Sequence, residues 1–267
     1  MSRCRANPAG GRRLTWAPLA ALLLTACPSN HGLRPDGPRF ETAEQLLQAM
    51  RSRRLQALRV EGTVDMRRGD KRVKAHMIYL TRRPAWLRFE TESFFDQPLS
   101  ILVTDGMRFA AWDMKNGRFV RGSATPAHIA RIIPVPLDGS EVAGVLMGDP
   151  PWIPYARARL DWDADRGLYR MELTTARARQ VALVEPRLLR PLAVELWRHD
   201  RRVYQLQYED WIERQGRAVV PRKIRFEMPA DEIRLRIKIR RAQADPELAD
   251  ELFVLEPPAG VVIERWP

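Results

Sequence analysis

Residues 232–241 read Glu-Ile-Arg-Leu-Arg-Ile-Lys-Ile-Arg-Arg, and this stretch decides the fold class. Aliphatic side chains stand at Ile233, Leu235, Ile237 and Ile239, and a basic residue follows each of them. Because successive side chains of a β-strand point to opposite faces of the sheet, the stretch predicts a strand with one aliphatic and one cationic face. Helices or a second sheet must cover such an aliphatic face, unless it lines a lipid-sized cavity.

The same period-two alternation recurs on the N-terminal side of this strand. The dipeptides Asp105-Gly106 and Asn116-Gly117 are strong hairpin signals between alternating segments. The first half of the chain is therefore expected to be an antiparallel meander, and strands return after a helical interlude. The other predicted strands cover residues 58–66, 73–79, 86–92, 99–104, 107–114, 158–162, 168–174, 192–198, 203–211 and 218–227.

Helices are predicted in two places. Thr42 and Gln45 have the spacing of a capping box, which favours a helix start. Thr125-Pro126 predicts a second start, and Asp138 or Ser140 a third, in an interlude that ends before Pro150. In the first helix the apolar residues with helical spacing are Ala43, Leu46, Leu47, Met50 and Leu58.

The N-terminus has the layout of a secretory signal peptide over residues 1–26. A leader with four arginines and no acidic residue precedes a short apolar run at residues 14–24. Leu24-Thr25-Ala26-Cys27 resembles the bacterial lipobox, which implies that a diacylglycerol and an N-acyl chain become attached to Cys27. An ordinary secreted protein with an incidental cysteine is the alternative. Residues 27–39, rich in Pro, Gly and polar residues, predict a lipidated cysteine followed by a flexible tether.

Composition and charge narrow the class of protein. Cys4 would leave with the signal peptide and Cys27 would be acylated, so no disulfide is expected in the mature chain. The formal charge of +12 falls to +8 when the four leader arginines are removed, which suits anionic lipid or an acidic partner. Nucleic acid is not expected as a partner of an exported chain. Residues 40–267 fit one mainly β domain.

Sequence motifs for catalysis or metal binding are weak. The four histidines lack a second metal ligand at a useful spacing, and no nucleophile and base can be assigned. We therefore expect no enzyme, no metal site and no cofactor beyond the lipid on Cys27. Asp161, Asp163 and Asp165 approach the ligand spacing of a calcium loop, but Arg166 stands where that loop needs glycine. The favoured interpretation is a hairpin that turns at residues 164–167.

An aromatic loop is predicted at Phe94, Phe95, Pro98 and Leu99, between two strands. Large apolar side chains in a loop need a contact that removes them from water. Two interpretations stay open. Either the phenylalanines fill the mouth of their own barrel, or they enter lipid at the headgroup boundary, where aromatic side chains are favoured.

Taken together, the lipobox, tether, capped helix, Val-x-Gly-x-Val strand, two meanders and helical interlude resemble the outer-membrane lipoprotein insertases (LolB-like) and their periplasmic carrier relatives (LolA-like). Pro98-Leu99 is similar to the Pro-Leu of the insertase's protruding loop. Residues 133–149 are similar to the helical plug, and residues 253–260 to the closing strand of carrier-like members. Ser100 departs from the family pattern, which has glycine after the leucine.

The resemblance implies a single antiparallel, unclosed β-barrel with helices over an apolar concave face that accepts acyl chains. It implies a monomer held at the periplasmic face of the outer membrane, since Pro28 rather than Asp follows Cys27. The partners would be the membrane, a periplasmic carrier and an acylated lipoprotein cargo that this chain inserts. An envelope scaffold or lipid-binding lipoprotein without insertase activity is the alternative. The expected cavity lining is Ile233, Leu235, Ile237, Ile239, Trp112, Val145 and Leu146.

Overall fold

The computed structural model describes residues 35–135, 137–214 and 217–267. The signal peptide, Cys27 and most of the tether predicted from the sequence lie outside the described residues. All described residues fall in one compact unit. The helices are α1 (Ala43–Arg51), α2 (Pro126–Ile132) and α3 (Gly139–Leu146), with 3₁₀ turns η1 (Pro229–Asp231) and η2 (Asp250–Phe253).

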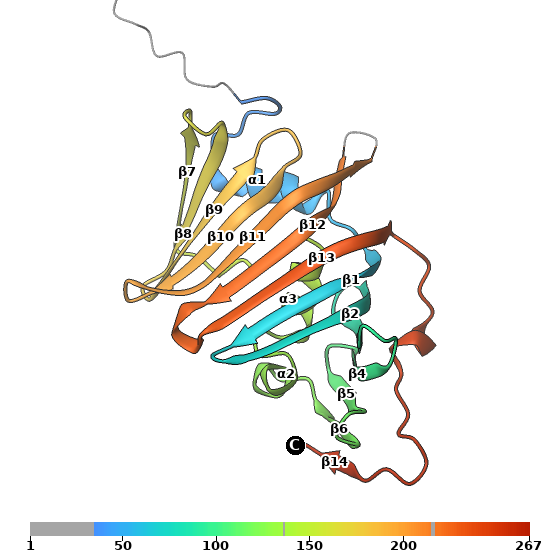
Figure 1. The fold of residues 1–267 in the computed structure, drawn as a ribbon. Helices are drawn as coiled ribbons and strands as arrows, with labels where there is room; N and C mark the ends of the chain where they lie inside the picture. The colour runs from blue at the N-terminus through green and yellow to red at the C-terminus, as the bar shows by residue number, and fades with distance from the viewer. Residues whose placement is uncertain (1–34, 136, 215–216) are drawn as a thin grey trace, which may run out of the picture. The chain divides into compact units, whose positions relative to one another are not determined.

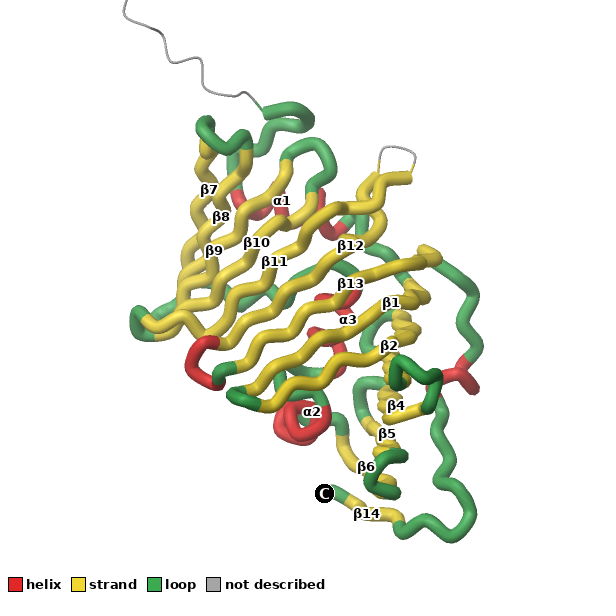
Figure 2. The backbone as a smooth tube through the Cα atoms, in the orientation of Figure 1, coloured by secondary structure: helices red, strands yellow, loops and turns green. Residues whose placement is uncertain are grey.

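Fourteen strands make one sheet (Figures 1 and 2). Its order is β14-β6-β5-β4-β3-β2-β1-β13-β12-β11-β10-β9-β8-β7. The strands are β1 (Ala57–Arg68), β2 (Lys71–Arg82), β3 (Trp86–Glu92), β4 (Pro98–Thr104), β5 (Arg108–Asp113), β6 (Arg118–Ser123), β7 (Arg157–Asp163), β8 (Leu168–Thr174), β9 (Ala178–Glu185), β10 (Arg190–Arg198), β11 (Arg201–Arg214), β12 (Arg217–Met228), β13 (Ile233–Ala244) and β14 (Ile263–Arg265).

The sheet is an unclosed barrel, as the sequence predicts. Strands β7 and β14 stand at its two edges, and the non-local pairing of β1 with β13 joins the two meanders. Figures 1 and 2 view the sheet from its outer face, with α1 and α3 behind the strands on the inner face. The helices therefore cover the apolar side of the sheet.

Strand β13 has the two faces that its sequence predicts. Ile233, Ile237 and Ile239 are buried, Leu235 is half-buried, and the intervening basic residues are exposed. A bulge interrupts the pairing of β13 with β1 beside Gly62. A Cβ atom at Gly62 would lie 2.2 Å from the carbonyl oxygen of Lys238, so this close approach of two strands requires glycine.

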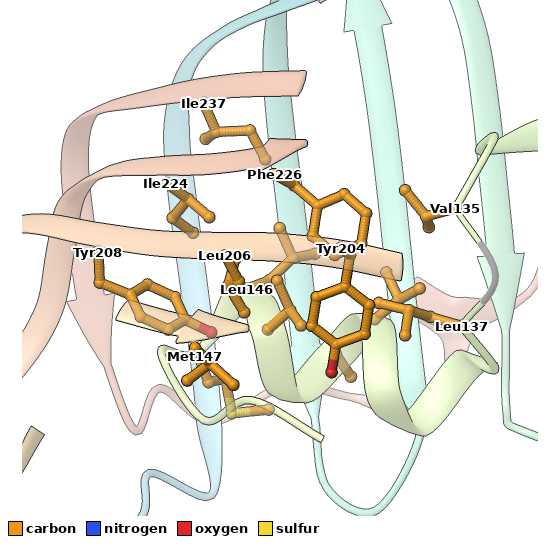
Figure 3. Packing of buried hydrophobic residues seen from close by; sticks show 14 of the residues in the cluster. Val135, Leu137, Leu146, Met147, Tyr204, Leu206, Tyr208, Ile224, Phe226 and Ile237 are labelled. Atoms are coloured by element: carbon orange, nitrogen blue, oxygen red, sulfur yellow. The ribbon is translucent and has the colours of Figure 1, made fainter. Parts of the chain in front are cut away.

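Buried aromatic and aliphatic side chains form one main core between the sheet and the helices (Figure 3). Tyr204, Phe226 and Ile237 project from the strands toward Leu146 of α3 and Leu137 of the segment before it. A second, smaller cluster lies on the outer face, where the chain after β13 crosses the sheet. Its members are Ala57, Leu80, Leu248 and Phe253, with Trp86 packed against them.

Three expectations about secondary structure were wrong. Leu58 belongs to β1 and not to the first helix, which ends at Arg51, because its side chain is buried by the sheet. Residues 253–260 do not form the closing strand; β14 lies beyond them. The strands β6, β9 and β14 were not predicted, because their apolar positions do not alternate strictly. The sheet is antiparallel as expected, apart from the short parallel pairing of β14 with β6.

Candidate functional site

A cavity of about 510 Å³ lies on the inner face of the sheet. Strands β1–β6, β12 and β13 form one wall, and α3 with the segment between α2 and α3 forms the other. Most residues that line the cavity are apolar. Its apolar residues are Val64, Met66, Val73, Phe89, Leu99, Ile101, Leu102, Ala111, Trp112, Val120, Ile132, Ile133, Pro134, Val135, Leu137, Val142, Val145, Leu146, Ile224, Phe226, Leu235, Ile237 and Trp266.

Capped helix ends hold the helical wall in place. Asp138 accepts a hydrogen bond from the backbone N–H of Glu141 (2.8 Å), and the Glu141 carboxylate accepts one from the N–H of Asp138 (2.9 Å). This is the reciprocal capping box of α3. Burial raises the pKa of Glu141 above its usual value. At the other end of α3, the buried Tyr79 hydroxyl donates to the carbonyl of Leu146 (2.9 Å), so strand β2 fixes the helix against the sheet.

Polar groups gather at the solvent-exposed rim of the cavity. Lys115 and Arg118 are exposed at the turn between β5 and β6, and Arg131 is exposed at the end of α2. Arg118 pairs with Glu264 (2.6 Å), and the guanidinium of Arg131 lies 3.8 Å from the ring centroid of Trp266. The rim thus holds three basic side chains against the carboxylates of Asp113 and Glu264, which leaves a small net positive charge, while the inner walls are apolar. A ligand with a long apolar part and an anionic end matches this arrangement.

Several strand ends meet at the same end of the sheet as this rim. The antiparallel register brings together the β1–β2, β3–β4, β5–β6 and β12–β13 turns. Val73, which lines the cavity, is 49 % exposed there. Phe94 and Phe95 in the β3–β4 turn are 46 % and 88 % exposed. An exposed apolar group therefore lies beside the cavity opening.

The phenylalanines do not fill the barrel mouth. Phe94 packs edge-on against His76, with ring centroids 4.7 Å apart, and the Lys74 ammonium lies 5.4 Å from its ring centroid. Lys74 and His76 alternate along β2 with the buried Ala75 and Met77, so they project from the outer face. The self-filling interpretation of this loop is therefore wrong.

Only some of the residues that were predicted to line the cavity do so in the structure. Leu235, Ile237, Trp112, Val145 and Leu146 line the cavity. The structure places two others elsewhere: Ile233 and Ile239 share the inner face of β13, but neighbouring side chains bury them in the packed core away from the cavity.

The Pro-Leu pair lies in a different setting from the one the resemblance implies. Pro98 and Leu99 open strand β4 instead of lying in the loop, and Leu99 points into the cavity wall. In the pairing of β3 with β4, Thr91 and Ser100 share a side-chain hydrogen bond of 2.7 Å. Leu99 is thus half-buried, and Phe95 is the protruding apolar residue of this region.

Sequence reasoning missed the cavity residues on β1–β4 and at the C-terminus, such as Met66, Phe89 and Trp266. Alternation on β3 assigns Phe89 to the same face as Leu87, which was an available signal. Trp266 had no such signal, because it reaches the cavity only through the pairing of β14 with β6.

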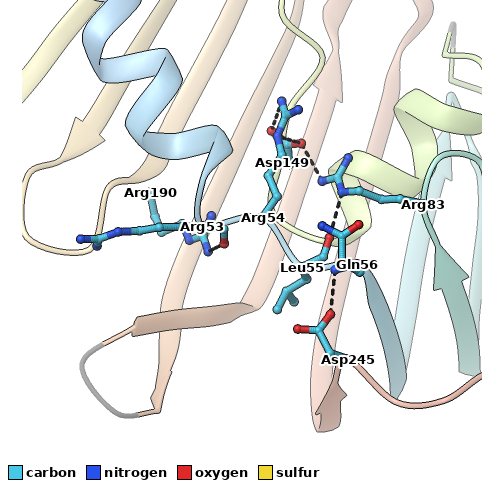
Figure 4. A network of polar contacts seen from close by, with 8 residues as sticks. All are labelled: Arg53, Arg54, Leu55, Gln56, Arg83, Asp149, Arg190 and Asp245. Carbon is cyan, nitrogen blue, oxygen red and sulfur yellow. Dashed lines mark hydrogen bonds and ion pairs between the residues drawn. The ribbon is translucent and has the colours of Figure 1, made fainter.

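A polar network lies near the opposite ends of the strands (Figure 4). Asp149, just after α3, pairs with both Arg54 and Arg83 at 2.7 Å. Arg190 nearby is 5 % exposed and donates to the carbonyl of Arg53, and burial lowers the pKa of its guanidinium to about 10. The network ties the segments that follow α1 and α3 to the β2–β3 turn.

The aspartates of the supposed calcium loop lie on a hairpin, as the favoured interpretation expects. Asp163 opposes Leu168 across the turn, and the N–H of Gly167 donates to the carbonyl of Asp163 (2.8 Å). Asp161 pairs with Arg159 at 2.8 Å. Within the described ranges, no three His, Cys, Asp or Glu residues are grouped so that they could hold a metal ion. Among these residues there is also no helix with the length and apolarity needed to span a bilayer.

Comparisons with known proteins identify the fold. No protein-family model and no curated protein matches the chain. Among solved structures, a DUF1329 family protein from Desulfovibrio piger superposes with a TM-score of 0.55 at 17% identity, over 79% of this chain and 95% of that one. A LolA superfamily protein from Nitrosomonas europaea gives 0.53 at 14% identity, over 80% and 98%.

A putative outer membrane lipoprotein-sorting protein domain from Vibrio parahaemolyticus gives a TM-score of 0.51 at 8% identity, over 78% of this chain and 94% of that domain. At such identities the similarity shows the fold alone. The chain has the LolA-like unclosed-barrel fold.

Proposed function

We propose that this chain is a lipid-binding protein of the bacterial envelope that holds acyl chains in the cavity on the inner face of its sheet. The observation that carries the proposal is the cavity itself, whose volume of about 510 Å³ and apolar walls suit a hydrocarbon ligand. Ligand sites commonly have about 300–1,000 Å³. Each methylene buried there contributes about 0.8 kcal/mol, so binding needs no covalent chemistry and no catalytic group.

The fuller form of the proposal adds an anchor and a transfer step. Lipid on Cys27 would hold the domain at the periplasmic face of the outer membrane. The cavity would receive the acyl chains of a lipoprotein from a periplasmic carrier and release them into the bilayer. The exposed Phe95 beside the opening supports this step. The Vibrio structure is named for lipoprotein sorting, which gives further support.

Acyl-chain uptake can be measured with a fluorescent fatty acid. Leu235→Trp should fill part of the cavity and lower uptake at least tenfold. Leu183→Trp is the matched control, because Leu183 is a half-buried residue on the outer face of β9. Unchanged uptake of the fatty acid by Leu235→Trp would contradict the proposal.

Insertion can be tested separately from binding. Phe95→Glu should leave uptake intact and slow release of an acylated lipoprotein into liposomes, because a charged residue at the opening resists entry into lipid. Normal release by this variant would remove the transfer step and leave the binding step standing.

A second candidate is an envelope protein that binds a lipid without inserting lipoproteins. The position of Leu99 favours it, since this residue lines the cavity and is not available as the tip of a protruding loop. Mass spectrometry of the gently extracted protein separates the candidates: co-purified phospholipid without acylated peptide supports the second one.

A further inference from the structure

The outer face of the sheet carries a second feature, separate from the cavity. Besides Arg59 near the start of β1, six exposed basic side chains on the outer face of β1, β2 and β13 form no ion pair with a carboxylate in the described part of the chain. They are here called the basic face: Arg67, Lys74, Arg234, Arg236, Lys238 and Arg240.

The strand register places like charges directly opposite one another. Arg236 faces Arg225 on β12, Lys238 faces Lys223, and Arg234 faces Arg67 on β1. Like charges at opposed positions of neighbouring strands destabilise a sheet. Two carboxylates also face this strand: Glu227 stands opposite Arg234 and Asp65 opposite Arg236, but Asp65 pairs with Arg72 at 2.6 Å. Arg225 pairs with Glu209 and Lys223 with Asp210. The four basic-face cations of β13 therefore outnumber the carboxylates opposite them and form no ion pair among the described residues.

The other half of the same outer face is arranged differently. On β7–β10, Arg159 pairs with Asp161 and Arg170 with Glu172, both at 2.8 Å, and Arg202 of β11 pairs with Glu195 at 3.1 Å. On these strands most outer-face cations have a carboxylate partner, although the exposed Arg157 of β7 has none, whereas the six cations of the basic face form no ion pair among the described residues.

Exposed aromatic side chains border the basic face. Lys74 belongs to it and also contacts the ring of Phe94, and Phe95 next along the chain is 88 % exposed. Cations suit the anionic headgroups of a bilayer, and aromatic rings suit its headgroup boundary. An acidic protein would account for the cations, but it would not account for a phenylalanine left in water.

We propose that the basic face, with Phe94 and Phe95 at its margin, is a docking surface for a bilayer containing anionic phospholipid. Docking there would set the orientation of the domain on the membrane and bring the cavity opening, at the same end of the sheet, to the lipid surface. The proposal stands on surface charge and exposure, and does not depend on what the cavity binds.

Vesicle flotation tests the proposal. The chain would carry Cys27→Ser, so that a lipid anchor cannot cause binding. It should float with phosphatidylcholine vesicles that contain phosphatidylglycerol, and not with phosphatidylcholine alone. Added salt should weaken binding, because salt screens exposed charges. Failure to bind the anionic vesicles, or equal binding to both kinds, would overturn the proposal, whatever acidic proteins the chain binds.

Charge removal then locates the surface. Arg234→Gln, Arg236→Gln and Lys238→Gln together should lower the vesicle partition coefficient about 100-fold. The matched control removes the same charge from the other half of the outer face, by Arg159→Gln, Arg170→Gln and Arg179→Gln, and should change binding less than threefold. Equal losses in the two triple variants would show that only net charge matters. Thermal unfolding confirms that each variant is folded, and unchanged fatty acid uptake separates this surface from the cavity.

Discussion

The two halves of the sheet have strands with the same alternating pattern, but they differ in how the inner face is packed and in how the charges of the outer face are paired. In the half made of β7–β11, large side chains such as Met171, Leu173 and Leu206 are fully buried, and arginines on the outer face pair with carboxylates. In the half made of β12, β13 and β1–β6, the inner face encloses a cavity and the outer face of β13 carries unpaired cations. One half is closely packed and mostly charge-paired, and the other contains a cavity and cations without ion-pair partners among the described residues.

The largest expected effect is a difference in the free energy of unfolding between variants in the packed half and variants in the half that contains the cavity. Leu173→Ala should lower the free energy of unfolding by about 2–5 kcal/mol, because it opens a void in a close-packed region. Leu235→Ala should cost no more than about 2 kcal/mol, because its side chain already borders empty space. Denaturant unfolding of both variants measures the difference. Equal losses would contradict the division into a packed and a hollow half.

The next effect concerns the polar network that ties the segments after α1 and α3 to the β2–β3 turn. Asp149→Ala should cost about 2–3 kcal/mol, since it leaves Arg54 and Arg83 partly buried without their shared carboxylate. Asp161→Ala on the exposed hairpin serves as the control and should cost much less. If the two variants unfold at the same denaturant concentration, the network of Figure 4 contributes little to holding the helices.

A smaller effect is expected at the attachment of α3. Tyr79→Phe removes the hydrogen bond to the carbonyl of Leu146 and should cost about 1 kcal/mol. Hydrogen exchange should become faster in α3 and stay unchanged in α1, because only α3 loses a contact. Unchanged exchange in α3 would mean that apolar packing alone holds this wall of the cavity.

The smallest effect concerns the outer faces. Arg236→Gln should change the Tm by at most about 2 °C, since it removes both the like-charge opposition to Arg225 and the opposite charge that faces Asp65. Arg170→Gln should lower the Tm slightly, because it breaks the pair with Glu172. A clear loss of stability in the Arg236 variant would indicate that the basic face is structural and not a surface kept for binding.

Much of the fold was predictable because interactions between residues close in the sequence determine the local structure at particular positions. The alternation of Ile233, Leu235 and Ile237 with basic residues predicted the strand and both of its faces. Asp138, one of the two caps that the sequence offered for this helix, starts α3, and its capping box with Glu141 was not predicted. Where several signals were lacking, as at β9 and β14, the prediction missed the strand.

The candidate site was less predictable, because apolar side chains on one face of a strand can either pack in the core or line a cavity. Ile233 and Ile237 have the same sequence context and both are buried in the core, yet only Ile237 also borders the cavity. The phenylalanines of the β3–β4 turn were recognised as unusual, but their direction depends on contacts with His76 and Lys74 of another strand.

The amino-acid sequence by itself determined the class of fold, the faces of the strands and the starts of the helices, since each depends on side chains a few positions apart. The position of Cys27 after a signal-like leader also predicts a lipid anchor. Only the tertiary structure decided which apolar residues surround a cavity and which cations remain unpaired. Both depend on the pairing of β1 with β13, which joins residues far apart in the chain and determines what lies opposite each side chain.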